Sequence, residues 1–172
     1  YSFDVYINGS RVYDYTFELT ESSYFTAGVL CHEFFHVLGA PDLYHYNSNG
    51  SPDAVGGWDV MESTSNPPQY MGAFMKWKYG DWLPEIPEIT STGTYTLNPL
   101  QQQENAAYKI ASPNSETEYY VVEYRVKEGV YESNTPGSRD GLLVYRINTE
   151  AGNGNAQGPP DEVYLYRPGG TL

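Results

Sequence analysis

The hydrophobic pattern begins with two short alternating runs, one from Phe3 to Ile7 and the other from Arg11 to Phe17. They flank Asn8-Gly9, and both residues of such a pair accept the positive φ that a tight β-turn requires. The pattern therefore predicts a β-hairpin near the beginning of the sequence.

An apolar run with helical character follows, from Tyr24 to Leu38. Ser22 and the residues beside it carry side chains that cap helix N-termini, whereas Gly39 and Pro41 are typical of the end of a helix. We predict a helix from about Ser22 to Leu38.

Residues 41–68 are rich in Asn, Gly, Ser, Asp and Pro and show no helical period. A long irregular segment inside a compact domain is usually functional or disordered. Here Trp58 and Met61 indicate that part of it is packed. A second helix is predicted from Gln69 to Tyr79, because Gly80 ends the pattern.

Beyond Pro84 the sequence consists of short runs typical of strands, separated by turn residues. The predicted strands are Ile89–Leu97, Ala107–Ala111, Tyr119–Val126, Leu142–Ile147 and Val163–Tyr166. Together the patterns predict an α+β protein. We place its first domain over residues 1–83 and a small all-β, antiparallel, sandwich-like region over residues 84–172.

Composition narrows the classes of partner. Nine basic residues stand against 22 acidic ones, for a formal charge of −13. This balance argues against nucleic acid and against an anionic membrane surface, since both are bound by clustered Lys and Arg. No apolar run approaches the roughly 20 residues of a membrane span. Cys31 is the single cysteine, and we expect it to be a small packed residue and not a metal ligand.

The sequence HEFFH at residues 32–36 has the spacing of a zinc-binding helix. Because they are four residues apart, His32 and His36 project from one helix face and can bind one tetrahedral ion. Glu33 lies beside the first histidine and can take a proton from a metal-activated water. Gly39 permits a sharp turn out of the helix, which would bring Asp42 back as a third ligand.

The longer segment HEFFHVLGAPD resembles the extended motif HExxHxxGxxD of metzincin-type zinc peptidases. Its continuation, PDLY, GGWDVM and PPQYMGAFMKWKYGDW, is similar to the immune inhibitor A-like family of secreted bacterial metallopeptidases, over roughly residues 29–83. The later segments LLVYRIN and VYLYRPGG resemble, more weakly, the part that follows the catalytic core in that family. The resemblance implies a metzincin-like core that is partial on its N-terminal side, since only 31 residues precede His32.

The resemblance also implies the roles of individual residues. His32, His36 and Asp42 would bind Zn²⁺, and Glu33 would be the general base and acid. Met61 would be the methionine of the Met-turn, which forms an apolar floor beneath the metal.

Two roles stay open in this assignment. Some metzincins have a tyrosine two residues after the Met-turn methionine to stabilise the oxyanion, and Ser63 holds that position here. The candidates for a substitute are Tyr70, Tyr44 and His45. Glu62 is the alternative third ligand if Asp42 does not reach the metal.

Two loops rich in acid and amide side chains are candidates for Ca²⁺, which takes oxygen ligands. One contains Asn47, Asn49, Asp53 and Asp59, and the other is the segment from Asn153 to Asp161. The alternative for both is an ordinary solvated loop, because neither has the spacing of an EF-hand.

We predict a zinc-dependent endopeptidase that hydrolyses peptide bonds in extracellular proteins. Its expected partner is a protein or peptide substrate. The substrate could pair with the strand over Arg11–Phe17 if that strand has an exposed edge; the alternative is a strand that is paired on both sides. We expect a monomer that is secreted or located in the cell envelope. The alternative is a non-catalytic, β-rich, surface-binding protein whose zinc site is vestigial or structural.

Overall fold

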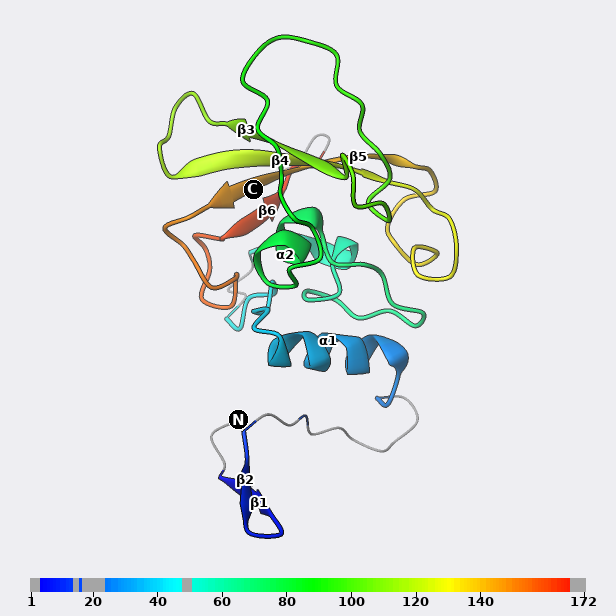
Figure 1. Ribbon diagram of the computed structural model, residues 1–172, viewed down its shortest axis with the longest axis vertical. Helices are drawn as coiled ribbons and strands as arrows, with labels where there is room; N and C mark the ends of the chain where they lie inside the picture. The colour runs from blue at the N-terminus through cyan, green and yellow to red at the C-terminus, as the bar shows by residue number, and fades with distance from the viewer. Residues whose placement is uncertain (1–3, 14–15, 17–23, 48–50, 168–172) are drawn as a thin grey trace.

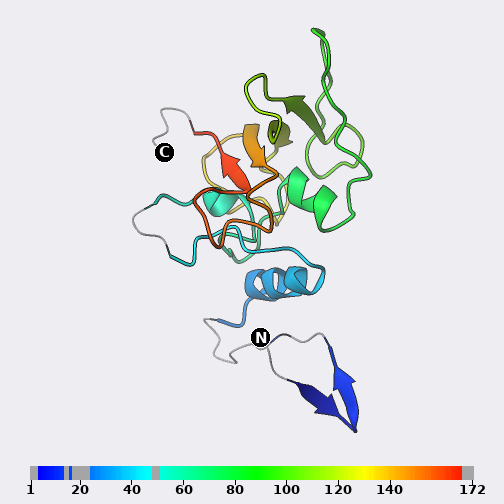
Figure 2. The same ribbon diagram turned by 90° about the vertical axis from the view of Figure 1, so that its left-hand side faces the viewer.

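A computed structural model describes residues 4–13, 16, 24–47 and 51–167 of the chain. It is an α+β structure with a two-stranded hairpin, two α-helices, a short 3-10 helix and a four-stranded sheet. The sheet lies on one side of helix α2, and helix α1 lies on the other side (Figure 1). The view turned by 90° shows the hairpin beyond α1, at the end farthest from the sheet (Figure 2).

The predicted hairpin is confirmed over a shorter range. Strands β1 (Val5–Ile7) and β2 (Ser10–Val12) pair antiparallel. Asn8 and Gly9 have φ values of 50° and 79°, so the turn uses the conformation for which this pair is suited. The second strand ends at Val12 and does not continue to Phe17, a residue that lies outside the described part of the chain.

Helix α1 (Ala27–Val37) begins later than predicted. Thr26 is the N-cap: its backbone is extended, and its side-chain oxygen accepts a hydrogen bond from the N–H of Val29 at 3.3 Å. Residues 24 and 25 are therefore not helical, and the cap expected at Ser22 lies outside the described residues. The end of the helix is as predicted, because Gly39 adopts a φ of 96° immediately after it.

Helix α2 (Ala73–Lys78) is shorter than the predicted range of residues 69–79. Residues 69–72 before it are not helical, and carboxylates from other parts of the molecule bind amides at its start. Gly72 donates its N–H to Asp59 at 2.6 Å, and Ala73 donates to Glu123 at the same distance. These tertiary hydrogen bonds satisfy N–H groups that a longer helix would have used, so the helix begins only at Ala73.

Four of the five strands predicted beyond Pro84 are confirmed within one residue at each end. They are β3 (Ala107–Ala111), β4 (Glu118–Arg125), β5 (Gly141–Asn148) and β6 (Val163–Leu165). Each pairs antiparallel with the next, in the order β3-β4-β5-β6. The sandwich-like arrangement was wrong for the described residues, since these strands form one open sheet.

The strand predicted over Ile89–Leu97 was also wrong. Isolated parallel bridges flank the segment, one between Glu88 and Lys109 and one between Pro99 and Tyr124, and Ile89 donates its N–H to the carbonyl of Lys109. Residues 90–96 are exposed, so no burial of alternating side chains holds this segment in a sheet.

The apolar core extends across the boundary predicted at Pro84. One cluster joins Leu43, Met61 and Phe74 with Val121 and Tyr145 of the sheet. How the chain divides into domains stays a prediction, as does the metzincin-like core, but the two halves share this buried contact.

A buried ionic cluster accompanies the core. Arg125 of β4 pairs with Glu123 at 2.7 Å and with Glu132 at 2.9 Å, and all three side chains are almost fully buried. Arg125 also donates to the carbonyl of Trp58 at 2.8 Å. The cluster therefore attaches the sheet to the irregular segment that leads to Met61.

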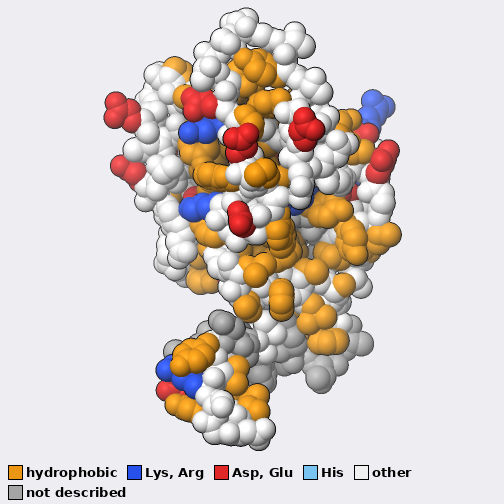
Figure 3. All heavy atoms as spheres, in the orientation of Figure 1, with side chains coloured by type: hydrophobic (Ala, Val, Ile, Leu, Met, Phe, Trp, Pro, Cys, Tyr) orange, Lys and Arg blue, Asp and Glu red, His pale blue; other side chains and the backbone are white. Residues whose placement is uncertain are grey.

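On the face shown in Figure 3, hydrophobic side chains are exposed at the level of α1 as well as over the sheet region, whereas acidic side chains lie mainly over the sheet region. The outer side of α1 exposes Leu30, Phe34 and Val37, with Phe34 61% accessible. Among the residues described, neither helix has the length and apolar content needed to cross a membrane.

Removal of the buried Arg125 side chain should make the protein easier to unfold. Arg125→Ala leaves Glu123 and Glu132 buried without their counter-charge, and we expect it to lower the free energy of unfolding by about 3–5 kcal/mol. Urea denaturation followed by circular dichroism measures this. Arg139, which is exposed, is the control, and Arg139→Ala should change the stability by less than about 0.5 kcal/mol. Equal effects of the two substitutions would contradict a structural role for the cluster.

Candidate metal centre

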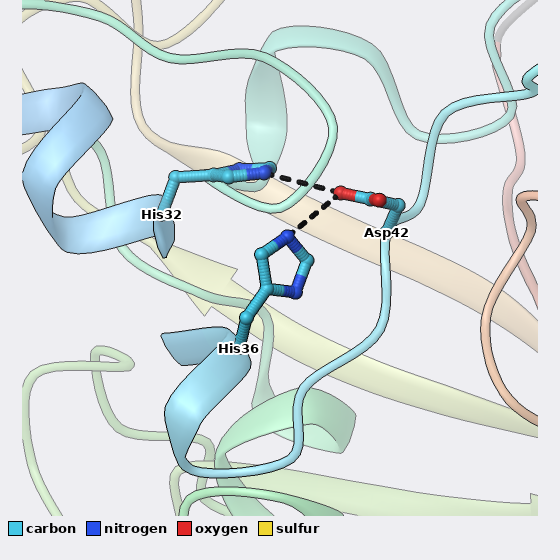
Figure 4. A group of neighbouring side chains, drawn as sticks. All are labelled: His32, His36 and Asp42. Carbon is cyan, nitrogen blue, oxygen red and sulfur yellow. Dashed lines mark ion pairs between the residues drawn. The ribbon is translucent and has the colours of Figure 1, made fainter. Parts of the chain in front are cut away.

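Three side chains that were predicted as ligands converge at one point (Figure 4). The Nε2 atoms of His32 and His36 lie 3.1 and 3.2 Å from Oδ1 of Asp42. The potential ligand atoms all lie within 4.8 Å of one another, so the group could hold a metal ion. The histidines come from one face of α1, and Asp42 follows the turn at Gly39.

Main-chain carbonyls orient both imidazole rings. Nδ1 of His32 lies 2.8 Å from the carbonyl oxygen of Val60, and Nδ1 of His36 lies 2.8 Å from that of Ala40. A carbonyl oxygen only accepts hydrogen bonds, so each Nδ1 must carry the hydrogen. In the neutral ring, Nε2 then presents a lone pair toward Asp42, which is the tautomer that a metal ligand needs.

The carboxylate completes an arrangement that calls for a cation. Oδ1 of Asp42 is buried and has no hydrogen-bond partner. It faces two nitrogen lone pairs, so the site is repulsive unless a proton or a metal ion lies between them. Around a tetrahedral zinc ion with bonds of about 2.0–2.1 Å, ligand atoms are separated by roughly 3.3 Å. The two distances from Asp42 are close to this value, all ligand atoms lie within 4.8 Å of one another, and imidazole nitrogens and a carboxylate oxygen are ligand types that zinc takes.

The electrostatics of the cluster follow from the same contacts. Burial by itself would raise the pKa of Asp42, but the two imidazoles and the Tyr46 hydroxyl bind its charged form and hold the pKa well below its usual range. The pKa of His36 is raised, mainly by its contact with Asp42 and to a smaller extent by the charge of Glu33. Burial lowers the pKa of His32, but its contacts with Asp42 and Val60 raise it above the ordinary value overall.

Tyr46 is a member of the site that the sequence did not reveal. Its hydroxyl donates to Oδ2 of Asp42 at 2.5 Å, so the second carboxylate oxygen is satisfied while the first is left for the metal. That contact, more than burial, raises the pKa of Tyr46. No motif marks this tyrosine among the 18 in the sequence, and only the folded chain identifies it.

Glu33 lies on α1 next to His32 and is partly buried. Its charge contributes to the raised pKa values of His36 and Tyr46, after the larger contribution of Asp42 in both cases. The side chain therefore lies within electrostatic reach of the cluster.

The three candidates for oxyanion stabilisation have different surroundings. Tyr44 stacks on the ring of His32, with centroids 6.3 Å apart. His45 instead contacts Asp161 at 2.6 Å, and the Tyr70 ring lies under the ammonium group of Lys76 at 4.5 Å. Of the three, Tyr44 is the one that contacts a predicted ligand, and the role itself stays a prediction.

Met61 and Glu62 follow Val60, whose carbonyl orients His32. Met61 is fully buried, and its carbonyl accepts from Leu43 at 2.9 Å, next to Asp42. Its role in a Met-turn stays a prediction. Glu62 does not belong to the metal-binding group found among the described residues. Its Oε2 instead accepts from the N–H groups of Val55 and Gly56, at 2.5 and 2.6 Å.

The remaining candidates have structural contacts. Cys31 is a free thiol that packs against the core from the neighbouring face of α1. Asp59 is buried and accepts from the N–H groups of Met61 and Gly72. Asp161 contacts His45. The Ca²⁺ sites stay a prediction, and Asn49 lies outside the described residues.

A comparison with known protein families gives a match, and it includes the segment that carries this cluster. Residues 4–78 match the family described as immune inhibitor A peptidase M6, catalytic domain. The match covers less than half of the sequence but includes the hairpin, α1 and α2. No curated protein and no solved structure matches the chain. The family match supports a metallopeptidase, and with it a metal in the cluster.

The titration of Glu62 gives a prediction. Burial raises the pKa of Glu62 to about 8, although the N–H groups of Gly56 and Val55 favour its charged form. The folded protein therefore binds more protons than the unfolded chain between about pH 4.5 and about pH 8. In this window the contribution of Glu62 to the free energy of unfolding falls as the pH rises.

Glu62→Gln keeps an oxygen that accepts the two N–H groups and removes the titration. We expect the stability of the variant, relative to the wild type, to increase as the pH rises through that window. Urea denaturation at several pH values measures the difference. Glu128 is exposed, and Glu128→Gln should follow the wild-type pH profile. Parallel profiles for Glu62→Gln and the wild type would show that Glu62 is not protonated in the folded protein.

Proposed function

We propose that this chain carries the active centre of a zinc-dependent endopeptidase that acts on extracellular proteins or peptides. The observation that carries the proposal is the buried Oδ1 of Asp42, which accepts no hydrogen bond and lies 3.1 and 3.2 Å from the Nε2 atoms of His32 and His36. The match of residues 4–78 to a peptidase family supports the same reading.

His32, His36 and Asp42 would hold the zinc ion. When bound, zinc supplies a Lewis acid that polarises the scissile carbonyl and acidifies the attacking water. The carbonyls of Val60 and Ala40 keep the Nε2 atoms directed at the ion, and the Tyr46 hydroxyl orients the carboxylate. Hydrogen bonds of this kind orient the ligands of a metal ion.

Glu33 is the group that would move the proton. Its carboxylate accepts a proton from the attacking water and then delivers it to the nitrogen of the leaving amine. Two observations support this role: Glu33 is adjacent to His32 on α1, and its charge influences His36 and Tyr46.

The alternative function, a binding protein with structural zinc, is less well supported. Structural zinc sites usually have four protein ligands. In the part of the chain that the structure describes, the group contains three. Three ligands leave a coordination position for water, as catalysis requires.

The choice of third ligand can be tested by metal binding. Asp42→Ala should weaken zinc binding by more than about 100-fold, beyond the loss typical of residues that only support a ligand. Glu62→Gln should bind zinc as the wild type does, because Glu62 caps the amides at residues 55 and 56. Titration against a chelating indicator measures both affinities. The opposite order of the two affinities would make Glu62 the ligand.

The role of Glu33 can be separated from metal binding. Glu33→Gln should retain zinc, yet its kcat/KM for casein hydrolysis should fall by about 10²–10⁴-fold, the range for loss of general acid–base catalysis. Glu128→Gln, at an exposed position, is the control and should keep the wild-type rate. A zinc-loaded Glu33→Gln protein with full activity would refute the assignment.

A further inference from the structure

The segment that carries Asp42 is bound by a loop from the other end of the chain. The N–H of Asn155 donates to the carbonyl of Asp42 at 2.9 Å, and the N–H of Tyr46 donates to the carbonyl of Ala156 at 3.0 Å. Asp42 is the predicted metal ligand, and Tyr46 holds its second oxygen. The loop therefore contacts both residues that fix the carboxylate.

Asn155 is fully buried, and every polar group of its side chain is used. Its Nδ2 donates to the carbonyls of Leu43, at 3.0 Å, and Val163, at 2.8 Å. Its Oδ1 accepts from the N–H of Val163 at 3.0 Å. Since Val163 is the first residue of β6, one side chain ties the residue after Asp42 to the sheet.

At Gly154 the loop lies so close to the segment of Pro41 and Asp42 that only glycine fits. A Cβ at this position would lie 2.4 Å from the carbonyl oxygen of Asp42 and 2.7 Å from the side chain of Pro41. Its φ is +79°, which also favours glycine. Any side chain here would push on the backbone of the predicted ligand.

A second attachment lies three residues after Asp42. The side chains of His45 and Asp161 contact each other at 2.6 Å and are 4% and 8% exposed. This contact gives the third histidine of the sequence a partner outside the metal-binding group. Together with Asn155, it holds the ligand segment at both ends.

The loop itself is fixed from behind. Glu162 is buried, accepts from the N–H of Gly154 at 2.6 Å, and is bound by the side chains of Tyr79 and Lys78. Its neighbour Val163 begins β6. Residues of α2 and its C-terminal end therefore hold the loop next to the sheet. A loop fixed in this way also restricts the position of Asp42, whose carbonyl it binds.

We infer that Gly154 and Asn155 are positioning residues of the metal centre, which place Asp42 opposite the two histidines. The inference rests on the proposed function, because it concerns the affinity of that site for zinc. It makes the part of the chain beyond Pro84 a component of the metal site, acting through residues that never touch the metal.

The test compares two glycines with the same backbone conformation. Gly154→Ala and Gly129→Ala both place a methyl group at a positive φ, +79° and +75°, but a Cβ at Gly129 meets nothing within 4 Å. We expect Gly154→Ala to weaken zinc binding by about 10- to 100-fold, as loss of support for a ligand does. Gly129→Ala should bind zinc like the wild type. Equal zinc affinities of the two variants would overturn the inference.

Asn155→Ala provides an independent variant. It should weaken zinc binding to a similar degree and alter the visible absorption spectrum of the Co²⁺-substituted protein, which reports the arrangement of the ligands. Asn98→Ala, which removes an exposed side-chain hydrogen bond to Glu104, is the control. Unfolding in the presence of a chelator separates the two effects: a purely structural role would lower that stability and leave zinc affinity and the Co²⁺ spectrum unchanged.

The two proposals fail in different ways. A wild-type protein that binds neither Zn²⁺ nor Co²⁺ would refute the proposed function and the inference with it. A wild type that binds zinc, together with Gly154→Ala and Asn155→Ala variants of unchanged affinity, would overturn the inference alone.

Discussion

The carboxylate of Asp42 has one oxygen that is removed from water and faces imidazole nitrogens in place of a hydrogen-bond donor. Such an oxygen is costly to bury without a partner. Several surrounding contacts fix the position of this carboxylate and of the two imidazole rings. Two carbonyls fix the rings opposite it, a tyrosine holds its companion oxygen, and a distant loop holds its backbone. A metal ion would relieve the repulsion that this arrangement creates.

The acidic character of the chain also has a structural role beyond solubility. Several carboxylates are buried and accept hydrogen bonds from main-chain N–H groups outside the sheet and helix ladders. Asp59, Glu132 and Glu162 accept from segments without regular structure, and Glu123 accepts from the first residue of α2. A long irregular segment has amides that no helix or sheet satisfies, so side chains must do so. Part of the formal charge of −13 is therefore needed to fold the region around the metal centre.

Arg125 offsets part of the electrostatic cost of burying these carboxylates. It neutralises two of the buried carboxylates and binds the carbonyl of Trp58, close in sequence to Val60. The carbonyl of Val60 in turn orients His32. The four-stranded sheet thus supports the metal centre from two directions: through Arg125 on the histidine side and through the loop before β6 on the Asp42 side.

The sequence by itself determined the features that depend on residues close together in the chain. The spacing of His32 and His36 puts both on one helix face, Gly39 ends that helix, and Asn8-Gly9 makes a hairpin turn. The alternation of apolar residues also located four strands. Each of these follows from local geometry or side-chain period, so the structure could differ little from the prediction.

Only the tertiary structure decided the rest, because the partners are far apart in the sequence. The start of α2 depends on carboxylates from other segments, and the run over residues 89–97 lacks a partner that would bury it. His32 meets a carbonyl 28 positions away, and His45 meets an aspartate 116 positions away. A sequence motif records which side chains can bind a metal, but burial and long-range hydrogen bonds decide whether they are held where one can bind.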